Sequence, residues 1–277
     1  MYRIKTRKQL NDQVVLMEIE APQIAKKARA GQFIIYRVDE RGERVPLTIA
    51  DRNEEAGTIT IIFQTIGKST QSLAALSAGD EILDVSGPLG VATHYGDNIK
   101  RAAVIGGGVG CAIAYPQAKA LHTAGVAVDM IAGFRNKDIV ILEDELKAVS
   151  DKLFLATDDG SYGEKGFVTD ILRAQIEQGA QYDLVIAIGP VMMMKAVSEL
   201  TKLFGIPTLV SLNPIMIDGT GMCGGCRVTV GGKIRYACVD GPDFDGHQVD
   251  FTELMRRNAS YRDEEAAHIC RMTGEQR

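Results

Sequence analysis

A short apolar strand runs directly into a glycine-rich loop and then into a helix at one place in this sequence, residues 101–124. The strand is RAAVI (101–105), the loop is GGGVG (106–110), and a helical pattern continues to about residue 124. Strand and helix patterns then alternate as far as residue 212. Strands that alternate with helices form a parallel sheet with helices on both faces. Residues 98–214 are therefore predicted to be a doubly wound parallel-sheet α/β domain.

The individual elements of this domain are also predicted from their patterns. They are strands at 126–134, 152–156, 184–188 and 208–212, and helices at 143–150, 167–178 and 191–204. Proline cannot donate the backbone hydrogen bond that a helix interior requires. Pro116 therefore predicts either a kink in the first helix or a later start of that helix.

Residues 1–97 lack this alternation. They contain short segments rich in valine, isoleucine and phenylalanine at 13–20, 32–38, 58–64 and 81–85, with a possible short helix at 70–76. Several short strands separated by turn residues are typical of a small antiparallel barrel. We predict a barrel domain over 1–97, with the domain boundary near residues 96–100.

Residues 215–277 form a third predicted part, rich in glycine and cysteine. It contains the pattern D-x4-C-x2-C-x11-C, formed by Asp218, Cys223, Cys226 and Cys238. A plant-type [2Fe–2S] loop has the spacing C-x4-C-x2-C, followed by a fourth cysteine. This sequence matches that spacing with aspartate in the first place, so these four residues are predicted cluster ligands. A hairpin at 227–237 and a charged helical tail at 251–272 complete this part.

A structural zinc site with three cysteines and one aspartate or histidine is the alternative, with His247 or Asp240 as a further ligand. The count of five cysteines is odd and no signal peptide pattern precedes them, which is unfavourable for a disulfide framework. A reducing, cytoplasmic compartment is the expectation. Cys270 is expected to be an ordinary half-buried thiol of the tail helix.

The glycine-rich loop is a candidate nucleotide site. Such a loop lets the backbone approach a pyrophosphate, and the following helix N-terminus favours the negative charge. The residues in this position are Gly106, Gly107, Gly108 and Gly110. The alternative is a tight turn without a ligand. A second strand-to-helix junction contributes Gly189, Pro190 and Met192.

Two acidic residues follow a third strand of the same domain. Asp158 or Asp159 could accept hydrogen bonds from ribose hydroxyls, as an acid does in NAD sites. Equally, both could cap their loop and face water. The sequence leaves the choice between NAD(H) and NADP(H) open.

Composition excludes other classes of function. The net charge of −5 gives no basic stripe for nucleic acid, so no nucleic-acid partner is expected. No run of about 18 apolar residues exists, so no membrane span is expected. At 45% hydrophobic residues the chain is an ordinary globular sequence and not a disordered one.

The order of barrel, α/β domain and cluster loop resembles the ferredoxin–NADP⁺ reductase superfamily, over nearly the whole chain. Four segments carry the resemblance: GQF (31–33), ERVPLTIAD (43–51), IGKST (66–70) and GPLGVAT (87–93). The resemblance implies an FAD site formed by Arg44, Pro46, Leu47, Thr48, Ile66, Gly67, Lys68, Ser69, Thr70 and Gly87. One departure is that Val45 stands at the usual arginine position. Thr48 would lie near the flavin, and GGGVG and GPVMM (189–193) resemble the nicotinamide-cofactor motifs.

Two branches of that superfamily are the nearest in pattern. The aspartate with three cysteines resembles the bifurcating ferredoxin:NADP⁺ oxidoreductases, and the alternative is the dihydroorotate dehydrogenase electron-transfer subunit. The resemblance implies an NAD(P)H-dependent flavin and iron–sulfur oxidoreductase subunit with no catalytic side chain in the strict sense. His94 and Cys111 are alternative pocket residues, expected to be structural.

The bifurcating branch also implies partners. They are a larger flavoprotein subunit with [4Fe–4S] clusters, forming a heterodimer, and ferredoxin reached through the complex. A zinc-stabilised nucleotide-binding regulatory module is a non-enzymatic alternative on the same fold.

Overall fold

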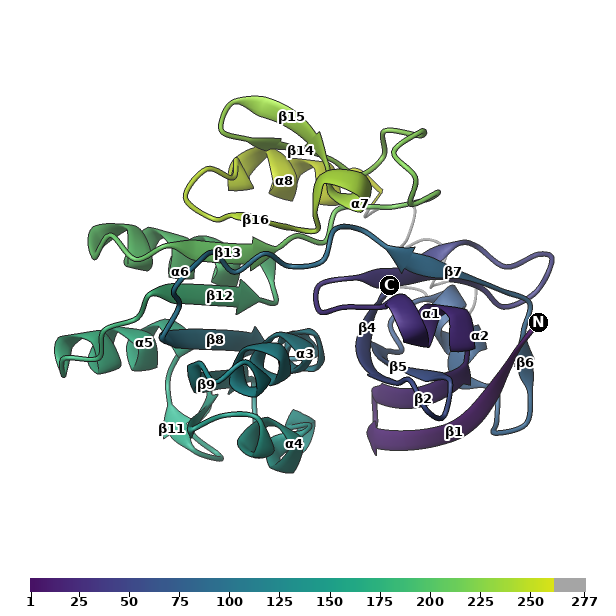
Figure 1. Ribbon diagram of the computed structural model, residues 1–277, viewed down its shortest axis with the longest axis horizontal. Helices are drawn as coiled ribbons and strands as arrows, with labels where there is room; N and C mark the ends of the chain where they lie inside the picture. Colours follow the sequence, from purple (N-terminus) through teal and green to yellow (C-terminus); the bar gives the residue numbers. More distant parts are fainter. Residues whose placement is uncertain (262–277) are drawn as a thin grey trace, which may run out of the picture.

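A computed structural model of the chain describes residues 1–261. Cys270 and the end of the predicted tail helix lie outside the described residues. The chain forms an antiparallel barrel sheet and a parallel sheet that lie side by side, with the C-terminal part beside both (Figure 1). The N-terminus lies on the barrel.

The barrel sheet has seven strands in the order β6-β1-β2-β5-β4-β3-β7, and every neighbouring pair is antiparallel. Its strands are β1 (Tyr2–Asn11), β2 (Val14–Glu20), β3 (Phe33–Arg37), β4 (Val45–Asn53), β5 (Thr58–Gln64), β6 (Glu81–Ile82) and β7 (Asp84–Leu89). Two short helices, α1 (Pro22–Lys27) and α2 (Lys68–Ala74), accompany it. The predicted antiparallel barrel architecture is confirmed. Strands β1 and β4 were not among the predicted strands.

The second sheet has the order β11-β10-β9-β8-β12-β13-β16. Its strands are β8 (Arg101–Gly107), β9 (Ala127–Phe134), β10 (Lys152–Thr157), β11 (Glu164–Lys165), β12 (Leu184–Ile188), β13 (Thr208–Ser211) and β16 (Asp243–Asp245). The helices are α3 (Gly110–Thr123), the 3₁₀ turn η1 (Lys137–Ile139), α4 (Glu143–Ala148), α5 (Val168–Glu177) and α6 (Val191–Leu203). Buried residues of α3 and α4 belong to one core cluster, and those of α5 and α6 belong to another. The sheet is therefore covered on both faces, as predicted.

Helix α3 runs without a break through Pro116, so the predicted later helix start is wrong. Pro116 is buried on the face that packs against the sheet. Tertiary packing here outweighs the hydrogen bond that the proline cannot donate.

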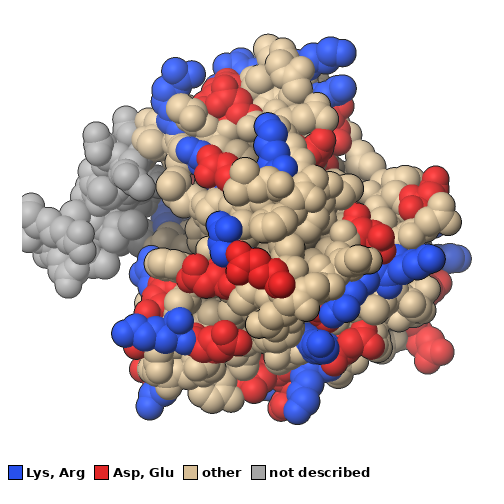
Figure 2. Space-filling view, turned by 90° about the vertical axis from the view of Figure 1, so that its left-hand side faces the viewer, with Lys and Arg blue, Asp and Glu red and all other residues tan. Residues whose placement is uncertain are grey.

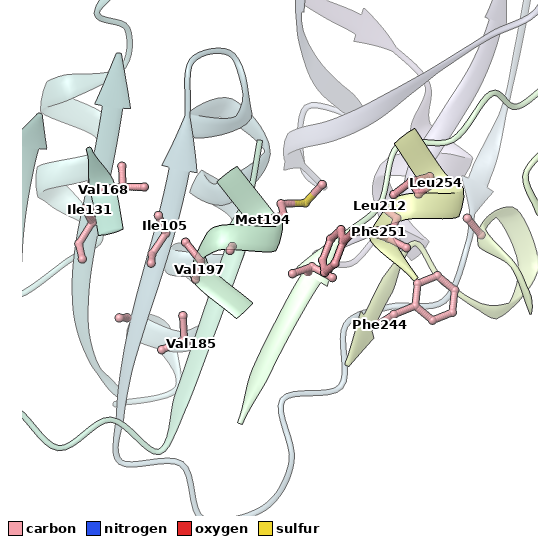
Figure 3. Packing of buried hydrophobic residues seen from close by; sticks show 14 of the residues in the cluster. Ile105, Ile131, Val168, Val185, Met194, Val197, Leu212, Phe244, Phe251 and Leu254 are labelled. Atoms are coloured by element: carbon pink, nitrogen blue, oxygen red, sulfur yellow. The ribbon is translucent and has the colours of Figure 1, made fainter. Parts of the chain in front are cut away.

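The C-terminal part returns to the parallel sheet. It contains the hairpin β14 (Arg227–Val230) and β15 (Lys233–Tyr236), then α7 (Ala237–Asp240), β16 and α8 (Phe251–Asn258). Strand β16 pairs with β13 in antiparallel register. Figure 3 shows Phe244, Phe251 and Leu254 in the cluster that also contains Met194 and Val197 of α6. Residues 215–258 thus pack on the core of the parallel sheet. No strand was predicted at 243–245.

The left-hand face of the molecule carries both signs of charge in alternation (Figure 2). Basic and acidic side chains are interspersed there, with uncharged surface between them. Among residues 1–261 no helix combines the length and the apolar character needed to cross a bilayer.

One buried ionic contact lies at the amino-terminal end of the parallel sheet. The Asp129 carboxylate, 1% exposed, accepts hydrogen bonds from Arg101 Nη2 at 2.6 Å and from the Tyr182 hydroxyl at 2.7 Å. An Asp129→Asn variant should lose about 1–3 kcal/mol in the free energy of unfolding, because the half-buried Arg101 and the buried Tyr182 lose a charged acceptor. Chemical denaturation monitored by circular dichroism measures this loss. An unchanged midpoint would contradict the structural role.

Candidate functional site

The carboxyl ends of β8 and β12 lie at the switch point of the parallel sheet, where the strand order reverses. These strands are neighbours, with Ile188 paired to Gly106. From β8 the chain passes through α3 to β9 on one side, whereas β12 lies on the other side. Ligands of open parallel sheets bind outside the strand ends at such a switch point. Both predicted nucleotide segments, 106–110 and 189–192, lie at this position.

Three glycines of the first segment allow close backbone packing at the two strand-to-helix junctions. A Cβ at Gly107 would lie 3.0 Å from Pro190 Cδ, and one at Gly110 would lie 2.5 Å from the Ile188 carbonyl oxygen. A Cβ at Gly106 would lie 2.7 Å from Cys111 Cα. These three glycines are therefore required by backbone packing, whatever ligand binds.

Gly108 differs from the other glycines of this loop. Its φ is +57°, in the left-handed region, and a Cβ added there would meet no atom within 4 Å. Its backbone N–H donates to the Gly133 carbonyl oxygen at 2.8 Å. The space beside this residue is open in the direction of a Cβ, and the approach of a pyrophosphate to a loop backbone needs such space.

The acidic residues after β10 are exposed. Asp159 Oδ1 accepts hydrogen bonds from the Ser161 hydroxyl at 2.6 Å and the Ser161 N–H at 2.9 Å. The hydroxyl contact first, and then the N–H, lowers the pKa of Asp159. Asp159 thus caps its own loop, while Asp158 beside it is exposed. Because β9 lies between β10 and β8, these two acidic residues follow a strand that is not adjacent to the strand of the glycine-rich loop.

On the barrel, β4 presents alternate residues to two sides. Thr48 pairs with Phe33, and Pro46 pairs with Ile35. Directly opposed residues of antiparallel strands share a face. Because Phe33 and Ile35 belong to the core cluster that includes the parallel sheet, Pro46 and Thr48 lie on the barrel's outer face. Leu47 instead packs into the barrel interior.

Val45 also packs into the barrel interior. Val45 is half-buried at the edge of that core, so a small apolar side chain suits the position. Arg44, one residue earlier, is exposed. The departure from the arginine pattern therefore has a packing reason in this chain.

The loop at 65–70 is shaped by one hydroxyl. Thr70 Oγ1 accepts hydrogen bonds from the Ile66 and Gly67 N–H groups at 3.1 and 3.2 Å. The Ser69 hydroxyl donates to Glu43 Oε2 at 2.7 Å, which joins this loop to the segment before β4. Arg44 and Lys68 are exposed near that link.

Gly87 has a packing role of its own. A Cβ there would lie 2.8 Å from Ile34 Cγ2, so the close contact of β7 with β3 accounts for this glycine.

An ion pair holds the barrel against the helix that follows the nucleotide loop. Lys119 Nζ of α3 lies 2.7 Å from both carboxylate oxygens of Asp51 on β4. The same ammonium group lies 5.6 Å from the centre of the Tyr115 ring. The contact places β4, which carries predicted flavin residues, against α3, the helix that follows the predicted nucleotide loop. Sequence reasoning missed it because residues 51 and 119 are far apart in the chain.

The predicted cluster ligands form two pairs. Cys226 Sγ and Cys238 Sγ are buried and 3.2 Å apart. Burial, followed by the contact with Cys226, raises the pKa of Cys238 to about 12. In the second pair, the half-buried Asp218 accepts a hydrogen bond from the N–H of the exposed Cys223 at 2.8 Å. Within residues 1–261 no three metal-ligating side chains already converge.

The loop nevertheless fits a bound cluster in its chemistry. Thiolates suit an iron–sulfur core, and hydrogen bonds to sulfur tune it. Two backbone N–H groups point at sulfur, Gly225 to Cys223 Sγ and Cys238 to Cys226 Sγ, each at 3.4 Å. Arg257 Nη2 of α8 donates to the Gly225 carbonyl oxygen at 3.2 Å, which ties the cluster loop to this helix.

The two alternative zinc ligands have other partners. His247 Nε2 lies 3.0 Å from Thr201 Oγ1 of α6. The Asp240 carboxylate accepts from the Tyr236 N–H at 2.7 Å. Neither side chain is directed to the cysteine pair by these contacts.

The cluster loop also lies against the outer face of the barrel. Gly219 has φ of +75°, and a Cβ there would lie 2.6 Å from Ile35 Cδ1 and 2.9 Å from Leu89 Cδ1. Ile35 is the residue paired with Pro46. The Asp218 end of the cluster loop and the predicted flavin face therefore meet at one surface.

Comparisons with known proteins give a consistent picture. A family described as the iron-sulfur cluster binding domain of dihydroorotate dehydrogenase B matches residues 213–250. A Thermotoga maritima protein named as a homolog of the dihydroorotate dehydrogenase B (NAD(+)) electron transfer subunit is 49% identical over 247 residues, covering 89% of this chain and 86% of that protein. The Clostridium perfringens dihydroorotate dehydrogenase B (NAD(+)) electron transfer subunit is 32% identical over 227 residues, covering 81% and 88%.

A solved structure is similar over the full length. It comes from work on flavin-based electron bifurcation by NADH-dependent reduced ferredoxin-NADP oxidoreductase. The two chains superpose with a TM-score of 0.92 and 44% identity, over 99% of this chain and 98% of the other.

Proposed function

The chain belongs to the family of dihydroorotate dehydrogenase B electron transfer subunits, and from this premise we propose that it is the electron-transfer flavoprotein subunit of a ferredoxin:NAD(P)⁺ oxidoreductase. The observation that carries the proposal is the meeting of the flavin face with two other segments. Gly219 of the cluster loop lies against Ile35, and Asp51 of β4 binds Lys119 of the nucleotide helix. One barrel face thus adjoins both the proposed entry and the proposed exit for electrons.

Each cofactor has a proposed set of residues. FAD would be held by Pro46 and Thr48 on the outer face and by the 66–70 loop, and NAD(H) or NADP(H) by the two junctions around Gly108. A [2Fe–2S] cluster would be held by Asp218, Cys223, Cys226 and Cys238. These cofactors supply hydride exchange and single-electron transfer when bound. The chain's own residues bind and orient them.

The test is an absorption spectrum of the anaerobically purified protein, with iron, sulfide and flavin assays. The expected result is flavin and iron–sulfur absorbance, with about one FAD and two irons per chain. A colourless protein containing zinc would overturn the redox proposal in favour of a zinc-stabilised nucleotide-binding module.

A second candidate is supported by the named relatives. It is the electron transfer subunit of a dihydroorotate dehydrogenase, which would pass electrons to a different partner. The full-length likeness to a chain from an electron-bifurcating enzyme favours the first candidate. We propose a larger flavoprotein subunit with [4Fe–4S] clusters as the partner. Co-purification from native cells distinguishes it from a dihydroorotate dehydrogenase subunit.

A Thr70→Val variant should retain less FAD. Valine keeps the shape of the side chain but removes the oxygen that accepts from the Ile66 and Gly67 N–H groups. Loss of such a cap costs about 1 kcal/mol. If that cost falls on FAD binding, the dissociation constant of FAD rises roughly fivefold. Measuring flavin retained after dilution and gel filtration checks this, and Thr70→Ser should restore retention. Equal retention by all three proteins would contradict the role.

A further inference from the structure

One carboxyl group lies where the barrel, the nucleotide helix and the returning strand β16 meet. Asp243 Oδ2 accepts a hydrogen bond from the Thr93 hydroxyl and one from Gln117 Nε2, the latter at 3.1 Å. Asp243 belongs to β16, Thr93 to the segment joining the two sheets, and Gln117 to α3. The other carboxylate oxygen, Oδ1, is buried. A single side chain therefore joins three parts of the fold.

The partners of this carboxyl are themselves held in place. Gln117 Nε2 also donates to Thr93 Oγ1 at 2.7 Å, and its Oε1 accepts from the Tyr95 hydroxyl at 2.6 Å. Gln117 is fully buried. Both ends of the Gln117 amide are occupied, so its orientation is set by the network and not by solvent.

The barrel backbone at Gly31 packs directly against Thr93 and Asp243. A Cβ at Gly31 would lie 2.2 Å from Thr93 Oγ1 and 2.8 Å from Asp243 Oδ2, and Gly31 has φ of +86°. The Thr93 N–H donates to the Ala30 carbonyl oxygen at 3.0 Å. Phe33, two residues after Gly31, is the residue paired with Thr48.

Each predicted cofactor segment is therefore only a few residues along the chain from a residue that lies close to this carboxyl. On the barrel side, Gly31 leads into Phe33 and the proposed flavin face. On the other side, Gln117 is seven residues from Gly110 along one helix, about 10 Å at 1.5 Å per residue. A helix transmits a displacement of its middle to its N-terminus as a rigid body.

We propose that Asp243 is a positioning residue for hydride exchange, which sets the nucleotide loop of α3 at a fixed separation from the flavin face of β3 and β4. The proposal rests on the proposed function, since it concerns the approach of nicotinamide to flavin. A misplacement of about 1 Å between reacting groups can lower a rate about 100-fold. Burial raises the pKa of Asp243, which is consistent with a group held away from water.

The first measurement is the single-turnover rate of FAD reduction by NADH, or by NADPH if that is the substrate, in the purified holoprotein. Asp243→Ala should lower this rate about 10- to 100-fold while the dissociation constant of the nucleotide changes less than threefold. The long-wavelength charge-transfer absorbance on nucleotide binding should weaken in parallel. Asp243→Asn keeps one acceptor oxygen and should restore much of the rate.

A matched control separates positioning from stability. Asp129 is also a buried carboxyl of the same sheet, with its partners Arg101 and Tyr182 inside that domain. Asp129→Asn should lower stability yet leave the FAD reduction rate unchanged. If Asp243→Ala and Asp129→Asn lose rate equally at equal stability, or if Asp243→Ala keeps the wild-type rate, the proposal is overturned.

Two further arms keep the test informative. If Asp243→Ala does not fold, Gln117→Leu removes the same bridge from the opposite side and should show the same loss of rate. Hydrogen exchange of the cofactor-free chain should become faster at residues 28–33 and 110–117 in either variant. This arm needs no bound cofactor. If NAD(P)H does not reduce FAD in the wild-type protein, the proposed function is overturned. If hydrogen exchange at these residues is unchanged in the variants, the proposed positioning role of Asp243 is overturned.

Discussion

Replacing Cys226 with serine is expected to abolish electron transfer from NAD(P)H to a one-electron acceptor, while FAD reduction by the same nucleotide persists. Cys226 is buried and its sulfur lies 3.2 Å from that of Cys238, so it is central to the proposed ligand set. Changing even a supporting residue of a metal site costs about 10- to 100-fold in affinity. A direct ligand should cost at least that much. Iron and sulfide assays with electron paramagnetic resonance of the reduced protein measure the loss.

The control is a cysteine outside the ligand set. Cys270→Ser removes one thiol from the chain but should leave iron content and acceptor reduction at the wild-type level. Asp218→Ala should lose iron as Cys226→Ser does, whereas Asp218→Cys should keep it, since the spacing then matches the four-cysteine loop. Full iron content in Cys226→Ser would contradict the ligand assignment.

A Gly108→Ala variant is expected to weaken nucleotide binding about tenfold or more, in addition to the loss of stability that alanine in a left-handed conformation causes. The added methyl would meet no protein atom within 4 Å, so it would extend into the space assigned to the pyrophosphate. Tenfold corresponds to about 1.4 kcal/mol of binding free energy. Alanine in a left-handed conformation costs about 1–2 kcal/mol of stability. Titration of the nucleotide by isothermal calorimetry and urea unfolding measure the two quantities separately.

Gly125 provides the matched variant for this test. It has φ of +82°, and a Cβ there would also meet nothing within 4 Å, but it follows the far end of α3. Gly125→Ala should therefore lose similar stability and bind the nucleotide as the wild type does. If the two variants bind equally, Gly108 does not face the nucleotide and the switch point is assigned to the wrong ligand.

Strands rich in buried residues were predicted well, whereas short or mostly solvated strands were missed. The strand β12 has five buried residues in succession, and its limits match the prediction of 184–188. The strand β1 is mostly exposed or half-buried and contains several charged residues, so no hydrophobic run marked it. β16 has only three residues and depends on pairing with β13. Short or solvated strands form because a partner strand supplies hydrogen bonds, which a local pattern does not reveal.

The predicted site residues divide in the same way. The glycine-rich loop, its helix and the cysteine spacing are local features, and each was recognised from residues adjacent in the chain. The Lys119–Asp51 ion pair and the Asp243 network join residues 68 to 150 positions apart. The common residue types lysine, aspartate, threonine and glutamine carry no signal of such pairing.

By itself the sequence determined the two kinds of sheet, the place of the nucleotide loop and the cysteine ligand pattern. It did so because hydrophobic period, glycine conformational freedom and ligand spacing act over a few residues. The tertiary structure alone decided which glycines of the loop serve packing and that Gly108 has open space beside it. It also decided that the cluster loop lies against the predicted flavin face of the barrel and that Asp243 joins the barrel to helix α3. These depend on contacts between distant segments, whose geometry is determined only when the whole chain packs.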